Sequence, residues 1–272
     1  MSARAVVAPL EPGWILLDGL PLFHRTGGPA AGGGEPVVHV HGFGISGSYL
    51  EPTAALLAAR WRTYVPDLPG TGRSIRPPQP LDIPGMAAAL LRYCDAVGLG
   101  RVSLVGNSLG CSVIVEVASR WPDRLARVVM VSPAGGPANR PIWRALGQMA
   151  MDGVREPPAM AALATRDYLR FGVRQSWALV KAMTTYPTLE RLRDLAAPTL
   201  VVAGRRDPLV HPERVRVFAG LAHVDAVVVP GAHALNFTAP ELIARLVDAH
   251  LDGRDVITAA PEAERLPVPQ EG

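Results

Sequence analysis

Four short apolar runs dominate the hydrophobic pattern of the chain. Each is rich in β-branched residues and almost free of polar positions: Val37–Val40, Val102–Val105, Val128–Val131 and Thr199–Val202. Such runs are too short for helices, and near-continuous apolarity is typical of strands buried on both faces of a parallel sheet. Weaker strand patterns occur at Tyr64–Val65 and Ala226–Val229, and an antiparallel opening pair is predicted at Trp14–Leu17 and Leu20–Arg25.

Helical patterns fill the segments between these strands. They cover Leu50–Ala59, Met86–Val97, Leu109–Arg120, His211–Leu221 and Pro240–Leu251. Alternating strands and helices imply right-handed crossovers, with helices on both faces of one sheet. The sequence therefore predicts an α/β fold with a mostly parallel, eight-stranded sheet flanked by helices.

The alternation stops in one long segment. From Pro137 to Tyr186 the pattern is helical throughout, which predicts a helical cap over residues 137–190. The cap separates a first part of the α/β core, residues 1–136, from a second part, residues 191–252. The last stretch, residues 253–272, is rich in Pro, Glu and Ala and poor in apolar residues, so a disordered tail is predicted there.

Composition narrows the class of protein. The chain has 272 residues, 49% hydrophobic and 19% charged, which is enough for a large core. The net charge is +3, but the basic residues are scattered arginines with Lys181 as the only lysine, so no nucleic-acid surface is expected. No run reaches the ~18 apolar residues of a membrane span, and the N-terminus does not resemble a signal peptide.

Two cysteines, Cys94 and Cys111, lie inside apolar stretches and are expected to be buried thiols in a reducing compartment. We therefore expect a cytoplasmic protein with a small-molecule substrate, without membrane or nucleic-acid partners. No pattern for a cofactor or a metal ion is present. The oligomeric state stays open, with a homodimer as one alternative.

The strongest chemical motif is Gly106-Asn107-Ser108-Leu109-Gly110. It follows a predicted buried strand and precedes an apolar helix, which is the context of a nucleophile elbow. Small residues two positions on either side allow a tight turn, and the start of the helix favours negative charge near the serine. We predict Ser108 to be a nucleophile rather than an ordinary helix N-cap.

A serine hydroxyl needs a base to take its proton, and His233 is the best candidate. His233 follows a predicted strand, at the sheet edge where ligands collect, whereas His39 lies inside a strand and is expected in the core. The acid that orients the base is predicted to be Asp207, after the Thr199–Val202 strand. The other loop that could carry an acid, residues 132–136, has no carboxylate.

An oxyanion hole needs two backbone N–H groups. Leu109, directly after the serine, is predicted to supply one, and Phe43 in the loop at residues 41–44 the other. His41 in the same loop is expected to hold the loop in place rather than to act in catalysis.

These motifs resemble the α/β-hydrolase superfamily over roughly residues 14–252. Besides the serine turn, the chain shows a His-Gly-x-Gly loop at residues 41–44, an Asp-x-Pro-Gly-x-Gly-x-Ser segment at residues 67–74, Gly-Arg-x-Asp at residues 204–207 and Gly-x-His at residues 231–233. The resemblance implies the α/β-hydrolase fold and the chain order Ser, Asp, His. Within this superfamily, the chain is similar to the subgroup of serine carboxylesterases and meta-cleavage-product hydrolases.

The leading expectation is hydrolysis of an ester or a thioester through an acyl-Ser108 intermediate. C–C bond hydrolysis of dioxo acids is an alternative, although Ile45 in the loop and Ala234 after the histidine depart from the usual pattern of those enzymes. Acyl transfer or cyclisation in a biosynthetic pathway and a non-catalytic small-molecule-binding protein stay open. The cap holds more arginines than acids, a hint of an anionic substrate. Its large apolar residues are expected to pack rather than to bind: Trp143, Met149, Met151 and Trp177.

Overall fold

The computed structural model describes residues 7, 9–30, 34–135, 142–188, 190–216 and 218–268. Within these ranges one sheet of nine strands runs through the molecule in the order β1-β2-β4-β3-β5-β6-β7-β8-β9. The strands are β1 (Glu11–Leu17), β2 (Leu20–Gly27), β3 (Val37–Val40), β4 (Thr63–Pro66), β5 (Val102–Asn107), β6 (Leu125–Val131), β7 (Thr199–Gly204), β8 (Val224–Val229) and β9 (Glu264–Arg265). The strands β3 to β8 pair in parallel, while β1, β2 and β9 add antiparallel edges.

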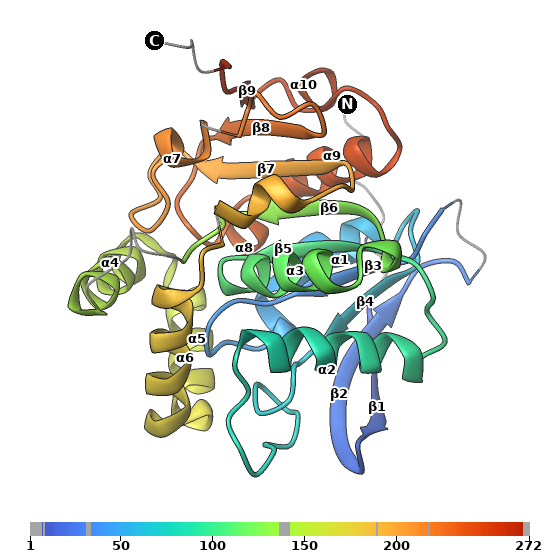
Figure 1. The fold of residues 1–272 in the computed structure, drawn as a ribbon, viewed down its shortest axis with the longest axis vertical. Helices are drawn as coiled ribbons and strands as arrows, with labels where there is room; N and C mark the ends of the chain where they lie inside the picture. Colours follow the sequence, from blue (N-terminus) through green and yellow to red (C-terminus); the bar gives the residue numbers. More distant parts are fainter. Residues whose placement is uncertain are drawn as a thin grey trace.

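Helices cover both faces of this sheet (Figure 1). In the view of Figure 1, α2 (Ile83–Ala96) and α3 (Leu109–Arg120) lie in front of the strands, while α1 (Glu51–Leu57) and α9 (Pro240–Leu251) lie behind them. The remaining short helices of the core are α7 (Pro212–Arg216), α8 (Leu235–Thr238) and α10 (Val256–Ala259). The predicted α/β architecture is confirmed, but the sheet has nine strands rather than the predicted eight, because the tail adds β9.

The apolar runs are continuous because successive side chains enter two different cores. In β6, Val128 and Met130 pack with the helices α2 and α3, whereas Val129 and Val131 pack with α9. All four side chains are fully buried. A strand with alternating exposure would need polar residues at every second position, and a strand buried on both faces excludes them.

The described part of the segment predicted to be a cap consists of helices joined by short connections. It contains α4 (Ile142–Arg155), α5 (Pro158–Phe171) and α6 (Val173–Thr185), followed by a 3₁₀ helix at Glu190–Asp194. The three helices lie together beside the ends of the strands toward which β7 and β8 point (Figure 1). The cap therefore covers the carboxyl edge of the sheet, where an α/β fold places its ligands. Residues 137–141 lie outside the described residues.

Two features differ from the sequence prediction. The helical pattern at His211–Leu221 forms a regular helix only over α7, with turns following at residues 218–220. The predicted disordered tail carries α10 and the strand β9, which pairs with β8. Its few apolar residues suffice because Val256, Ala260 and Ala263 are buried against the core on the α9 side.

Two other sequence expectations agree with the structure. Cys94 and Cys111 are buried and unbonded to each other. Both ring nitrogens of His39 are buried in β3 without a hydrogen-bond partner in the described part of the chain, and burial lowers the pKa of His39 to about 3. His39 is thus a neutral core residue. No helix among the described residues is long and apolar enough to cross a membrane.

Candidate active site

Ser108 stands between β5 and α3 on a backbone turn that few residues adopt. Its φ of 55° and ψ of −119° lie in a region that L-residues other than glycine avoid, and the surrounding structure must hold such strain. The N–H of Ser108 donates to the carbonyl oxygen of Val131 at 3.0 Å. A Cβ atom on Gly110 would lie only 2.2 Å from the carbonyl oxygen of Val40. The glycine therefore permits the close backbone approach that the turn requires, as the sequence pattern predicts.

His233 and Asp207 come from the loops that follow two neighbouring strands, β8 and β7. The Nδ1 atom of His233 lies 2.8 Å from Oδ2 of Asp207. The other carboxylate oxygen, Oδ1, accepts from the N–H groups of Leu209 at 2.8 Å and Val210 at 3.0 Å. With both oxygens bonded, the carboxylate fixes the orientation of the imidazole ring and leaves its Nε2 atom for chemistry.

The charges around this pair favour a protonated histidine. Burial alone lowers the pKa of His233, but the charge of Asp207, the hydrogen bond to it and the charges of Asp152 and Glu156 together raise that pKa to about 9. Burial would raise the pKa of Asp207, but the charge of His233 and the hydrogen bonds to the carboxylate hold it below its usual value. Sequence reasoning found the pair but not the two additional acids.

The loop after β3 lies directly against the serine turn. A Cβ atom on Gly42 would lie 3.2 Å from the Cβ atom of Ser108. The N–H of Gly42 donates to the hydroxyl oxygen of Tyr49 at 2.8 Å, which leaves Phe43 as the next N–H group in the loop. Leu109 is the first residue of α3, where helix N–H groups have no partner within the helix. Both residues that the sequence nominates as oxyanion donors therefore lie close to the serine.

Asn107 joins three parts of the site, a role that the sequence analysis did not find. Its Oδ1 atom accepts from the Tyr49 hydroxyl at 2.8 Å. Its Nδ2 atom donates to the carbonyl oxygens of Val131 at 3.1 Å and His233 at 3.3 Å. This side chain thus connects the loop after β3, the strand β6 and the histidine loop. The sequence offered one signal for this role, because Asn107 directly precedes Ser108 in the serine motif.

His41 holds the loop after β3 from below. Its Nε2 atom accepts from the N–H of Leu68 at 3.0 Å and lies 3.0 Å from the Thr71 hydroxyl, and its Nδ1 atom lies 2.9 Å from the carbonyl oxygen of Gly42. Burial lowers the pKa of His41. A neutral ring with Nδ1 as donor satisfies these contacts. This agrees with the predicted holding role.

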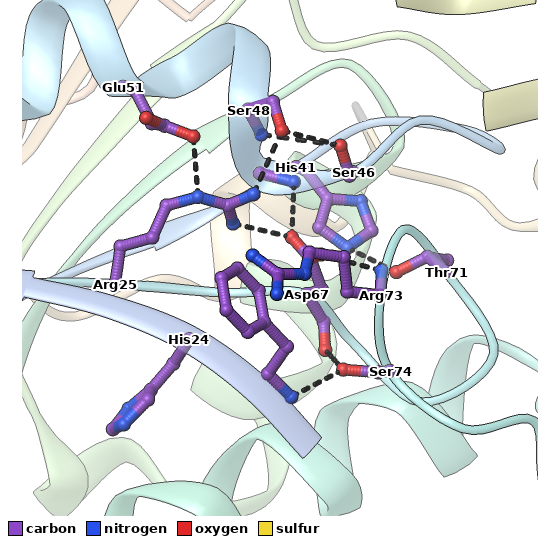
Figure 2. A network of polar contacts seen from close by, with 12 residues as sticks. His24, Arg25, His41, Ser46, Ser48, Glu51, Asp67, Thr71, Arg73 and Ser74 are labelled. Atoms are coloured by element: carbon purple, nitrogen blue, oxygen red, sulfur yellow. Dashed lines mark hydrogen bonds and ion pairs between the residues drawn. The ribbon is translucent and has the colours of Figure 1, made fainter. Parts of the chain in front are cut away.

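A second buried cluster fixes the same loop from the side, and we call it the Asp67 network (Figure 2). Asp67 follows β4, is completely buried, and accepts from Nη1 of Arg25 at 2.7 Å and from the N–H groups of Gly47 at 2.8 Å and Arg73 at 2.9 Å. Arg25 also pairs with Glu51. The network accounts for the Asp-x-Pro-Gly-x-Gly-x-Ser motif. Its aspartate supplies the carboxylate, and the turn that follows supplies the N–H of Arg73 that bonds to it.

One cap residue, Asp167 of α5, is bonded to the same loop. Its Oδ2 atom accepts from the N–H of Ser46 at 2.8 Å and from the Ser46 hydroxyl at 2.6 Å, while Oδ1 accepts from Nε of Arg166 at 2.9 Å. Burial alone would raise the pKa of Asp167, but the hydrogen bonds from Arg166 and Ser46 keep it below its usual value. The cap is therefore anchored to the loop that lies against the serine.

A cavity of about 120 Å³ lies between the core and the cap. Ser108, His233 and Phe43 all line it. Its apolar wall comes from both parts of the chain and includes Ile45, Met149, Met160, Ala164, Tyr168 and Met183. The cavity is thus a small, mostly apolar space that contains two of the predicted catalytic residues.

Two acidic residues of the cap, Asp152 and Glu156, also line the cavity, whereas no arginine or lysine is among the described residues that line it. Among the cap arginines whose side chains the structure describes, Arg144, Arg166 and Arg170 do not line this space, so they give no support to the sequence hint of an anionic substrate. Asp152 and Glu156 are four positions apart and share one face of the α4 segment. Sequence reasoning missed them because nothing in the pattern says which face meets the cavity.

The prediction that the large cap residues pack holds for Met149, which lies against the core and also lines the cavity. Trp143, Met151 and Trp177 are instead at least half exposed. None of these three packs in the core, and none lines the cavity. Their apolar character reflects the outer surface of the cap rather than its contact with the core.

Comparisons with known proteins place this geometry in a family. The model of the alpha/beta hydrolase family matches residues 37–246. A protein of Mycobacterium phage D29 named "Putative non-heme haloperoxidase" is 29% identical over 263 residues, covering 86% of this chain and 92% of that protein. "Putative carbamate hydrolase RutD" of Caulobacter vibrioides is 37% identical over 118 residues, and this match covers only 43% of either chain.

Among solved structures, a bacterial membrane phospholipase A is similar with a TM-score of 0.77 and 25% identity, covering 91% of this chain and 87% of that one. The family match includes β3, the serine turn, the cap and both loops that carry Asp207 and His233. The nine-stranded sheet and its helical cap agree with this match. The chain belongs to the alpha/beta hydrolase family.

Proposed function

We propose that Ser108, His233 and Asp207 form the catalytic triad of a serine hydrolase that cleaves esters or thioesters. One observation carries the proposal: the 2.8 Å contact between His233 and Asp207 orients a histidine whose cavity is shared with Ser108 on its strained turn. A nucleophile, a base and an acid that orients the base are the elements of such a triad.

The reaction has two halves. The Oγ atom of Ser108 attacks the carbonyl carbon while Nε2 of His233 takes the hydroxyl proton and then delivers it to the departing alcohol or thiol. Water then attacks the acyl-enzyme, His233 takes a proton from that water, and the proton returns to Ser108 as the carboxylic acid leaves. The N–H groups of Phe43 and Leu109 would stabilise the oxyanion in both halves.

The test is turnover of short-chain 4-nitrophenyl esters and matching thioesters by wild type, Ser108→Ala and Ser176→Ala. Ser176 lies on α6 and bonds to the carbonyl oxygen of Gly172, away from the cavity lining, so it is a matched control. We expect Ser108→Ala to lose at least ~10³-fold in turnover and Ser176→Ala to remain close to wild type. A Ser108→Ala variant that kept a tenth of the activity would overturn the proposal.

Covalent labelling separates an enzyme from a binding protein on the same fold. A fluorophosphonate should add to Ser108 of the wild type, and intact-protein mass should show one adduct that Ser108→Ala lacks. Labelling together with turnover supports the hydrolase. Labelling without turnover of any ester or thioester would instead favour a binding protein that keeps a reactive serine.

A further inference from the structure

The acidic pair in the cavity wall, Asp152 and Glu156, has an incomplete set of bonding partners. Oε1 of Glu156 accepts from the N–H of Ala234 at 3.0 Å, and Asp152 accepts a hydrogen bond from the backbone of His233. The second oxygen of each, Oδ1 of Asp152 and Oε2 of Glu156, is buried without a partner in the part of the chain that the structure describes. One oxygen of each residue therefore serves the protein, and the other does not.

Unbonded carboxylate oxygens in a cavity are costly. Buried polar atoms are nearly always hydrogen-bonded, and an unsatisfied one costs roughly 1–3 kcal/mol, more when it is charged. Burial raises the pKa of Asp152 to about 6, so near neutral pH this carboxylate is mostly ionised in spite of its surroundings. A protein that keeps two such groups beside its predicted nucleophile is suited to a ligand that supplies donors.

The groups that face this region favour a cation. Asp207 approaches His233 from the loop after β7, and Asp152 and Glu156 approach it from the cap. Tyr168 of α5 lines the same cavity. Three of these are carboxylates, and His233 is the one side chain among the described cavity-lining residues that can become positive. Charge-assisted N–H bonds are the strong partners of carboxylates.

A bound metal ion is not favoured by this arrangement. Among the residues that the structure describes, no three His, Cys, Asp or Glu side chains are grouped so that they could hold one. An organic cation is the alternative that supplies charge-assisted N–H donors. The small and otherwise apolar cavity suits a short molecule with a single charged nitrogen.

We propose that Asp152 and Glu156 determine specificity by binding a protonated amine of the substrate, so that the enzyme prefers short esters or thioesters that carry such an amine. This inference rests on the proposed hydrolase function. It also gives binding a second effect: an ammonium group beside the pair offsets the negative charge that holds the proton on His233. The histidine then more readily becomes the neutral base that attack by Ser108 requires.

The experiment compares two thioesters of the same shape. S-(2-dimethylaminoethyl) thioacetate is cationic at neutral pH, and S-(3-methylbutyl) thioacetate replaces its nitrogen by carbon. We expect kcat/KM for the amine to exceed that for the carbon analogue at least tenfold in wild type. The ratio should fall to about one in the variant Asp152→Asn/Glu156→Gln, whose amides can still accept from the N–H groups of His233 and Ala234. A ratio near one in wild type, or a ratio unchanged in the double variant, would overturn the inference.

Two controls complete the design. Asp123→Asn removes one exposed negative charge outside the cavity and should keep the wild-type ratio. Binding is measured without turnover by calorimetry on Ser108→Ala, with 2-(dimethylamino)ethanol against 3-methylbutan-1-ol. The amine should bind at least tenfold more tightly, and the two acid substitutions should abolish this difference. Equal binding would refute the inference even if Ser108 proves catalytic, and selective amine binding would support it even if the serine proves inert.

Discussion

Two sets of carboxylates near the candidate site differ in how their oxygens are bonded. In the Asp67 network, the carboxylate is completely buried and accepts from Arg25, Gly47 and Arg73. In the acidic pair of the cap, one oxygen of each residue bonds to the histidine loop and the other is buried without a partner in the described residues. The Asp67 network bonds to the segment after β3, and the acidic pair bonds to the histidine loop. Only the Asp67 carboxylate has described partners on both of its oxygens.

This difference distinguishes a carboxylate that stabilises the fold from carboxylates that are available to bind a ligand. A buried charge that is paired and fully hydrogen-bonded belongs to the finished fold, and removing it leaves other groups unpaired. In the acidic pair, the oxygens without a partner are the ones that we propose bind the substrate amine. Asp207 combines the two cases, because both of its oxygens are bonded and one of its partners is His233, the proposed general base.

The largest effect is expected at Asp207, where a complete set of bonds holds the acid of the proposed triad. In Asp207→Asn the amide can keep its place but favours the wrong tautomer of His233, so turnover should fall about 10⁴-fold with little change in stability. Steady-state ester hydrolysis and urea unfolding measure the two quantities. Asp95→Asn, which removes an exposed partner of Arg124, is the control. Near-normal turnover in Asp207→Asn would show that another group orients His233.

Asp67 has a full set of bonding partners but no proposed role in catalysis, so its loss should lower the stability of the fold. Asp67→Asn breaks a buried ion pair with Arg25 and should lower the free energy of unfolding by about 3 kcal/mol. Asp18→Asn provides the control, because it removes an exposed pair with Arg92 and should cost about 0.5 kcal/mol. Urea unfolding of both variants tests the contrast. Equal losses in the two would mean that the Asp67 network does not stabilise the fold.

Substitution in the acidic pair should have the opposite effect on the free energy of unfolding, namely a gain in stability. The folded protein holds the proton of Asp152 to about pH 6, whereas the unfolded chain releases it near the ordinary pKa of 3.8, so ionisation lowers stability as pH rises from about 4 to 6. Asp152→Asn removes that loss and should gain about 1 kcal/mol at pH 8, discounted for partial exposure. The gain should vanish below about pH 4. Urea unfolding of wild type and variant at pH 8 and below pH 4 tests this expectation. A loss of stability in Asp152→Asn at pH 8 would contradict a destabilising charge on Asp152.

The smallest effect is a shift in the pH profile. A general base must be neutral, so kcat/KM for an uncharged ester should rise with pH up to the pKa of His233, about 9. Because the charge of Asp152 contributes to that raised value, Asp152→Asn should move the rise to lower pH by less than about one unit. Asp123→Asn should leave the profile in place. A profile unmoved by Asp152→Asn would show that this acid does not act on the histidine.

The sheet and the serine turn could be predicted because their sequence signals are local. Continuous apolar runs such as Val128–Val131 have one explanation, burial on both faces, and the glycines around Ser108 mark a backbone approach that a side chain would block. Asp207 and His233 followed from their positions directly after predicted strands. In each case a few neighbouring residues contain the information.

The acidic pair could not be predicted because its role depends on docking. The spacing of Asp152 and Glu156 places them on one helix face, but only the seating of the cap decides whether that face meets water, the core or the cavity. The tail after Gly253 escaped prediction for a similar reason. Its few apolar residues are sufficient because the sheet edge and α9 already offer a surface.

That tail has a consequence for how the molecule meets its neighbours. Arg265 lies opposite Val227 and Glu264 opposite Val228, and the N–H of Leu266 donates to the carbonyl oxygen of Ala226 at 2.8 Å. Without this two-residue strand, β8 would present a bare row of main-chain donors and acceptors, which invites pairing between chains. The C-terminal segment therefore occupies the edge of β8, and its charged side chains, Glu264 and Arg265, disfavour pairing of the outer edge with another strand.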